Sequence, residues 1–150
     1  MRLCLFQPDM APNLGAAIRA ACCFGWDVDI IEPCGFPLTS KDIKRVAMDY
    51  QSMTQPLRHS SWEAWCKSEQ AKSGRTILLT TKGAQSLWDF TFQPGDIIMT
   101  GRESAGVPDH VHESADERVF IPMAPGARSL NVVVSASIAM AEAQRQLGMA

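Results

Sequence analysis

The first candidate for chemistry in this 150-residue chain is an arginine that follows a run of small residues. It is Arg19, at the end of the segment NLGAAIR (residues 13–19), where glycine and two alanines would let another molecule approach the backbone closely. A guanidinium can hold a phosphate or a hydroxyl group through several donors at once. Taken alone, the same arginine fits better with a salt bridge, or with a side chain lying along an apolar surface. Arg19 is therefore a candidate catalytic residue that needs support from the rest of the chain.

Three segments that follow apolar runs are the second candidates. They read LTTKG at 79–83, TGRE at 100–103 and IPMAPG at 121–126. Ligands of open α/β sheets bind outside the carboxyl ends of the strands. Three such loops side by side would form a cleft lined mainly by backbone amides and carbonyls. A cleft of this kind suits an adenosine-like ligand, whose base edge offers both donors and acceptors.

Several common signatures are missing. The sequence has no G-x-G-x-x-G after its first apolar run, no G-x-x-x-x-G-K-[ST] and no G-x-S-x-G, so the usual dinucleotide, phosphate-loop and hydrolase motifs are excluded. His110 and His112 are two residues apart and would point to different sides of a helix, which favours surface or capping roles over metal binding. We therefore expect no metal.

The elements that must position these candidates alternate between strands and helices. Strands are expected at 2–6, 27–32, 76–81, 96–100 and 117–121. Helices are expected at 14–24 with Asn13 as N-cap, after Thr39 or Ser40, after a Ser60-x-x-Glu63 capping box, at 108–114 and up to Leu147. The strands read as continuous apolar runs, which predicts an α/β fold whose parallel sheet carries helices on both faces. We see no linker or repeat and expect one domain over residues 1–150.

The last helix is unusually thin. After the strand and the Ser-Leu-Asn corner at 129–131, alanines and serines stand where a core helix usually carries leucine. A helix this thin raises the question of what lies against it.

Composition narrows the class of protein further. Hydrophobic residues make up 46% and charged residues 20%, and the net charge of −2 is a mild argument against a dedicated nucleic-acid binder. The cluster of Lys41, Lys44 and Arg45, with Arg58 and His59 nearby, fits either a local basic face or an ordinary solvated helix face. No apolar run approaches the ~20 residues of a membrane span, the start does not read as a signal peptide, and the five cysteines lack a C-x-x-C spacing. We expect a cytoplasmic protein with reduced, mostly buried thiols and no membrane contact.

Three motifs together resemble a known family. The segment NLGAAIR (13–19) resembles the first motif of the SpoU branch of the SPOUT RNA methyltransferases, GRESAG (101–106) their second, and IPM (121–123) leading to SLNV (129–132) their third. The motifs fall in the family order. The short chain is most similar to the subgroup that methylates the ribose 2′-oxygen of the wobble nucleotide, cytidine or uridine 34, of tRNA. The segments IEPCGF (31–36), DY (49–50) and TTKG (80–83) also resemble that subgroup.

The resemblance implies a deep C-terminal trefoil knot, an obligate homodimer and S-adenosylmethionine as methyl donor. By position it implies cofactor contacts from Leu79, Gly101, Ile121, Ser129 and Leu130, with Met123 beside them. Arg19 matches the proposed catalytic arginine, which would orient the 2′-oxygen or a phosphate. Glu103 matches a position associated with holding the loops and the dimer together. The subgroup often has tyrosine where this chain has Ala141, so a role for that tyrosine does not carry over.

The implied substrate is the tRNA anticodon stem-loop, with leucine tRNAs as the expected acceptors. A dimer would join Arg19, Lys44, Arg45 and Arg128 into one groove for the RNA. Two alternatives stay open at this point: a 2′-O-methyltransferase acting on another tRNA position or on ribosomal RNA, and a non-catalytic module that binds the cofactor and RNA.

Overall fold

The computed structural model describes residues 1–39, 55–83 and 85–148. In these residues the chain forms a seven-stranded sheet. Five of the strands come from apolar runs and two from shorter, polar segments. The expected helix after Thr39 or Ser40, with Lys41, Lys44 and Arg45, and the DY match at 49–50 lie outside these residues. The strands are β1 (Arg2–Phe6), β2 (Asp27–Ile31), β3 (Leu57–His59), β4 (Thr76–Leu79), β5 (Gln85–Ser86), β6 (Ile97–Thr100) and β7 (Glu117–Phe120).

The order of the strands places the three expected loops next to one another. The sheet runs β3-β2-β1-β6-β4-β7-β5, and every described strand pair is parallel. The loops that follow β6, β4 and β7 therefore leave three adjacent strands at the same edge. This confirms the predicted parallel sheet and the predicted neighbourhood of the three loops.

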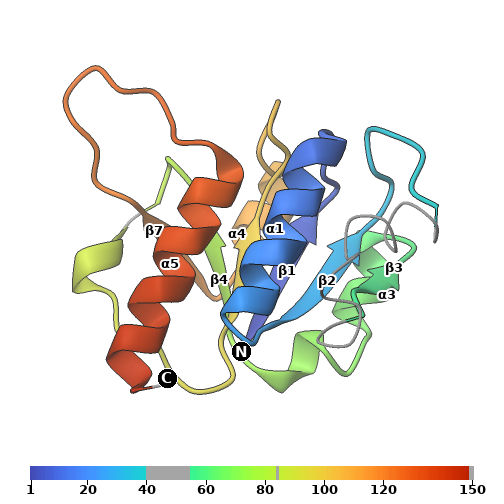
Figure 1. The fold of residues 1–150 in the computed structure, drawn as a ribbon, viewed down its shortest axis with the longest axis horizontal. Helices are drawn as coiled ribbons and strands as arrows, with labels where there is room; N and C mark the ends of the chain where they lie inside the picture. Colours follow the sequence, from blue (N-terminus) through green and yellow to red (C-terminus); the bar gives the residue numbers. More distant parts are fainter. Residues whose placement is uncertain (40–54, 84, 149–150) are drawn as a thin grey trace.

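Helices cover both faces of the sheet, as predicted (Figure 1). They are α1 (Ala11–Cys23), α3 (Trp62–Cys66), α4 (Asp109–Ser114) and α5 (Val132–Leu147), with short 3-10 helices at Ala71–Ser73 and Leu87–Asp89. One face packs its buried Leu3, Ile30 and Ile98 against α1 and α5. The other face packs Phe6, Ile31 and Met99 against α3 and α4. Alternate residues of each strand thus serve two separate hydrophobic cores.

The thin helix α5 uses its small residues against α1 and the sheet. Ala136, Ala139 and Ala143 are buried in the core that α1 shares. The Gln144 side chain donates a hydrogen bond of 2.7 Å to the Phe24 carbonyl just beyond the end of α1. The two helices lie side by side across the near face of the sheet (Figure 1). Close helix packing within the chain therefore accounts for the buried alanines.

Several local expectations were wrong. Asn13 does not cap α1, because the helix begins at Ala11 and Pro12 occupies its first turn, a position where a missing N–H costs nothing. The cap of α3 is Ser61 rather than Ser60, and its hydroxyl accepts a bond from the Ala64 N–H. The other strand and helix limits differ from expectation by at most two residues. β3 and β5 were missed, since they are two- or three-residue edge strands with polar residues.

Ion pairs fasten the amino-terminal end of the sheet. Arg2 donates to Asp29 at 2.6 Å and to Asp27 at 3.0 Å, and the fully buried Asp29 also contacts Nε2 of His59 at 2.7 Å. Arg75 pairs with the buried Asp96 at the start of β6. His59 is therefore buried, which corrects the expectation that it contributes to a basic face.

The cysteines are free, but they are less buried than expected. Cys4 and Cys22 are buried, Cys34 is half-buried, and Cys23 and Cys66 are exposed. Within the described ranges, no helix combines the length and apolar character needed to cross a bilayer. The same ranges contain no group of three or more metal-binding side chains placed to hold an ion.

Candidate active site

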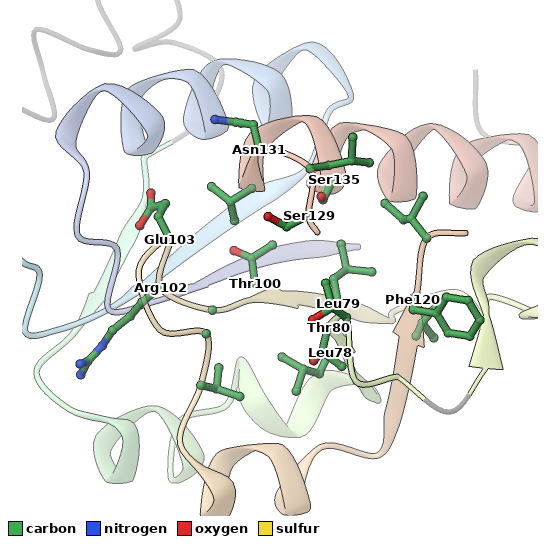
Figure 2. A pocket seen from close by; sticks show the side chains of 18 of the residues that line it. Leu78, Leu79, Thr80, Thr100, Arg102, Glu103, Phe120, Ser129, Asn131 and Ser135 are labelled. Carbon is green, nitrogen blue, oxygen red and sulfur yellow. The ribbon is translucent and has the colours of Figure 1, made fainter. Parts of the chain in front are cut away.

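A cleft of about 490 Å³ lies at the carboxyl ends of β4, β6 and β7, where the start of α5 meets them. Figure 2 shows side chains from these separate elements converging on it. Its size is in the range of small-molecule sites. The lining residues include Leu78, Leu79, Thr80, Thr100, Gly101, Arg102, Glu103, Gly106, Val119, Ile121, Met123, Ser129, Leu130, Asn131 and Ser135.

The walls combine apolar side chains with hydroxyl groups and backbone. Leu79 and Ile121 supply apolar surface, whereas Thr80, Ser129 and Ser135 supply hydroxyls. Such a lining can hold a flat apolar group and bind polar edges at the same time. Carboxylates are scarce in this lining, where Glu103 is the acidic member among the described residues.

The loop after β6 is closed on itself. The backbone N–H of Arg102 donates to the Gly106 carbonyl, and that of Gly106 donates to the Arg102 carbonyl, both at 2.9 Å. A Cβ on Gly101 would lie 2.6 Å from the Gly106 carbonyl carbon and 2.8 Å from its Cα. Only glycine leaves room for this approach, so Gly101 shapes one wall of the cleft.

A reciprocal contact fastens the same loop to the segment after β1. The Asp9 carboxylate accepts from the backbone N–H of Glu103 at 3.2 Å, from that of Ser104 at 3.3 Å and from the Ser104 hydroxyl. The Glu103 carboxylate accepts from the Asp9 N–H at 2.9 Å in return. Segments 94 residues apart in the chain are thus held together at the rim of the cleft.

The two carboxyl groups titrate differently because they share this contact. The hydrogen bond with Glu103, followed by that from Ser104, lowers the pKa of Asp9 to about 2. Burial, and next the hydrogen bond with Asp9, raises the pKa of Glu103 above its ordinary value. As the pH rises, Asp9 therefore loses its proton before Glu103, which holds its proton more tightly than an ordinary glutamate.

A hydrogen bond between Asn13 and Asn131 joins the first motif (residues 13–19) to the third (residues 121–132). The Asn131 side chain caps α5, since its oxygen accepts from the N–H groups of Val133 at 2.8 Å and Val134 at 3.3 Å. Its amide nitrogen donates to the Asn13 side-chain oxygen at 3.3 Å. The same residue therefore orients the last helix and closes one side of the cleft.

Leu79, Gly101, Ile121, Ser129 and Leu130 all line this one cleft, as does their expected neighbour Met123. Arg19 is different. It is exposed on α1 and is not among the residues that line the cleft of its own chain. Sequence reasoning missed Asp9, which is an isolated acid in a proline-containing loop and gives no local signal.

The residues and the fold together define a family. The model of the SpoU rRNA methylase family matches residues 1–141, and the chain belongs to this family. A tRNA (cytidine(34)-2′-O)-methyltransferase of Beijerinckia indica is 48% identical over 147 residues, covering 97% of this chain and 91% of that relative. The enzyme of the same name from Escherichia coli K12 is 35% identical over 150 residues, covering 99% and 94%.

Solved structures agree on the fold. One, from work on the 2-OH methylation of C/U34 on tRNA, has a TM-score of 0.87 at 34% identity and covers 98% of this chain and 95% of its own. The SpoU methyltransferase AviRb from Streptomyces viridochromogenes, in complex with AdoMet, has a TM-score of 0.84 at 23% identity, covering 100% of this chain and 61% of its own. At that identity the likeness concerns the fold alone.

Proposed function

We propose that this protein is an S-adenosylmethionine-dependent methyltransferase that modifies the ribose 2′-oxygen of the wobble nucleotide of tRNA. The observation that carries the proposal is the convergence of Leu79, Gly101, Ile121, Ser129 and Leu130 in one cleft. The names of the relatives at 48% and 35% identity support the nucleotide, cytidine 34, and the work behind the solved structure at 34% identity supports cytidine or uridine 34. The acceptor is the anticodon stem-loop, with leucine tRNAs as the proposed isoacceptors.

The cleft fits the proposed cofactor in size and chemistry. Leu79 and Ile121 give apolar surface for an adenine ring, and the hydroxyls of Thr80 and Ser129 give hydrogen-bonding groups for the polar parts. The close approach of Gly101 to Gly106 keeps the loop wall thin. S-adenosylmethionine, when bound, supplies a methyl group on a positively charged sulfur.

The chain contributes positioning to the reaction. The ribose 2′-oxygen forms a bond to the methyl carbon as the carbon–sulfur bond breaks, the electron pair stays on sulfur, and the hydroxyl proton leaves to solvent. Holding two reactants in the right geometry supplies roughly 7–11 kcal/mol in favourable model systems. In our proposal Arg19 orients the 2′-oxygen or an adjacent phosphate and stabilises developing negative charge.

Arg19 can take this role if the enzyme works as a homodimer. Arg19 is exposed and is not among the residues that line its own cleft, so in the proposal it serves the cleft of a second copy. Exposed Met10, Leu130 and Val134 lie near the start of α1 and α5, where their apolar surface would be covered by such a partner. Sedimentation of the purified protein measures the dimer directly.

Two further parts of the proposal come from the family motifs. One is that the C-terminal end of the chain forms a deep trefoil knot, within a single domain over residues 1–150. The other is a groove for RNA built from Arg19, Arg128, Lys44 and Arg45 of both copies. Phosphate contacts release counterions, so RNA binding is expected to weaken steeply with added salt.

The decisive experiment is methyl transfer from labelled S-adenosylmethionine to a leucine tRNA anticodon stem-loop. The expected result is one methyl group at nucleotide 34, and none on a matched stem-loop with a 2′-deoxyribose at that nucleotide. Labelling of both RNAs would show a different acceptor position, and transfer only to ribosomal RNA fragments would replace the tRNA substrate. Cofactor and RNA binding without any transfer would identify a non-catalytic module.

A further inference from the structure

Arg102 stands at the outer rim of the cleft, on the closed loop after β6. Its side chain extends away from Leu79 and Ser129, on the opposite side of the loop from Glu103 (Figure 2). The residue is exposed, and its guanidinium carbon lies 5.9 Å from the centre of the Phe6 ring. Arg102 thus lies beside the cleft without filling it.

The ring under Arg102 is held firmly in place. Phe6 is only 2% exposed and meets Trp62 edge-on, with ring centres 6.0 Å apart. Trp62 in turn stacks on the buried Trp65 at 5.1 Å. A guanidinium that lies over a fixed aromatic ring is attracted to the face of that ring. This contact orients one side of the Arg102 guanidinium toward protein while the residue as a whole stays exposed.

The charge of Arg102 is not neutralised by a carboxylate in the way that other arginine charges of this protein are. Arg58 pairs with Glu32 at 2.8 Å, and Arg2 pairs with Asp29 at 2.6 Å. In the described part of the chain, no carboxylate lies within ion-pair distance of Arg102. The acid next to it, Glu103, is engaged with Asp9 instead.

A glutamine in an uncommon backbone conformation comes directly after β1, next to Phe6 in the chain. Gln7 follows Phe6 and has a φ of 46°, which is uncommon outside glycine. Its side-chain nitrogen donates to the Glu32 carbonyl at 3.4 Å, whereas its buried side-chain oxygen has no hydrogen-bond partner among the described residues. Strained residues and unsatisfied buried polar atoms concentrate at functional sites.

We infer that Arg102 is an RNA-contacting residue whose guanidinium stacks on a nucleobase of the acceptor RNA, at or next to the nucleotide that receives the methyl group. Proteins that recognise single-stranded RNA stack unpaired bases on aromatic rings or on arginine planes. The exposed Arg102 plane, backed by Phe6 and placed at the rim of the cleft, offers such a surface. This inference rests on the proposed function, because it places the base beside the proposed cofactor site.

The test compares Arg102→Ala and Arg102→Lys with wild type at saturating S-adenosylmethionine. Lysine keeps the charge and loses the plane. Both variants are expected to raise the KM for the anticodon stem-loop about tenfold, in the range of one stacked base, with S-adenosylhomocysteine affinity within twofold of wild type. Arg145→Ala, an exposed arginine near the end of α5, is the matched control and should leave the KM unchanged.

Three outcomes would overturn the inference. An unchanged KM in Arg102→Ala would remove Arg102 from RNA binding, and wild-type behaviour of Arg102→Lys would replace stacking by a simple phosphate contact. Loss of S-adenosylhomocysteine binding in both variants would make Arg102 a structural residue of the cleft. If wild-type protein transfers no methyl group to any RNA, the proposed function fails. Fluorescence anisotropy of the labelled stem-loop then tests Arg102 separately, with wild type, the two Arg102 variants and the Arg145→Ala control.

Discussion

The two ends of the sheet are fastened by different chemistry. At the amino-terminal end, charged side chains pair directly, as in Arg2 with Asp29 and Arg75 with Asp96. At the carboxyl end, the contacts mostly join side chains to backbone: the Asp9 carboxylate accepts from the N–H groups of Glu103 and Ser104.

This difference separates stability from binding. Direct pairs between buried charges hold strands in place and leave little room for a ligand. Side-chain contacts to the backbone of a loop instead fix the shape of that loop. The side of the loop that faces the cleft stays available for a ligand, as in the loop after β6. We therefore expect changes at the amino-terminal end to alter folding, and changes at the carboxyl end to alter cofactor and RNA binding.

The largest expected effect is on stability and comes from Asp29→Ala at the amino-terminal end. The change leaves Arg2 and the buried His59 without their shared partner, and breaking a buried ion pair costs roughly 3–5 kcal/mol. Urea denaturation should show this loss, with S-adenosylhomocysteine affinity unchanged in protein that remains folded. Asp27→Ala removes the exposed partner of Arg2 and should cost less than about 1 kcal/mol. Equal losses in the two variants would contradict the role of burial.

Gly101→Ala at the carboxyl end should lower the affinity for S-adenosylhomocysteine rather than the stability of the fold. The added Cβ would come within 2.6 Å of the Gly106 carbonyl carbon, so the loop after β6 must move. We expect S-adenosylhomocysteine affinity, measured by calorimetry, to fall at least about tenfold, which corresponds to ~1.4 kcal/mol. Gly126→Ala, in the loop after β7 where a Cβ would meet no atom within 4 Å but φ is 87°, separates backbone strain from the steric effect. A similar loss of affinity in both variants would argue against the close approach.

The pH dependence of stability gives a smaller effect at the carboxyl end. The folded protein raises the pKa of Glu103 above 4.5 through burial and the bond with Asp9. The stability that Glu103 contributes is therefore complete below pH 4.5 and is lost as the pH rises through the raised value. Glu103→Gln keeps a neutral donor and should flatten this part of the curve in urea denaturation between pH 4 and 8. A curve of unchanged shape would show that another group titrates there.

The smallest expected effect is at an exposed pair that belongs to neither end. Lys72 and Glu69 are 3.0 Å apart with more than half of each side chain accessible, and pairs of this kind contribute about 0–1 kcal/mol. Lys72→Ala should change neither the urea midpoint by a measurable amount nor methyl transfer. A loss comparable to that of Asp29→Ala would overturn the comparison between buried and exposed pairs.

The sequence predicted the long-range geometry better than the local details. Apolar runs with loops after them place Leu79, Gly101 and Ile121 at one edge of a parallel sheet, and this was correct because the strand period and the parallel pairing are strong signals. The start of α1 was wrong because Pro12 and Asn13 are both acceptable near a helix start, and only the backbone decides between them.

Other features could not be found from the sequence because their partners are distant. Asp9 is separated by 94 residues from the loop that it holds in place. β3 pairs with β2, and its Arg58 and His59 side chains contact Glu32 and Asp29 in a distant part of the chain. The resemblance in three motifs gave the cleft residues. It did not indicate that Arg19 lies outside the cleft lining of its own chain.

The contact between Asn13 and Asn131 has a consequence for the order of events during synthesis. The seven strands of the described residues all precede residue 121, whereas the Ser129–Asn131 corner and α5 leave the ribosome afterwards. A nascent chain can thus pair its strands while one side of the cleft is still missing. The chain should therefore gain affinity for its ligand abruptly, when α5 packs against the sheet. Ligand binding would then show that synthesis of the polypeptide is complete.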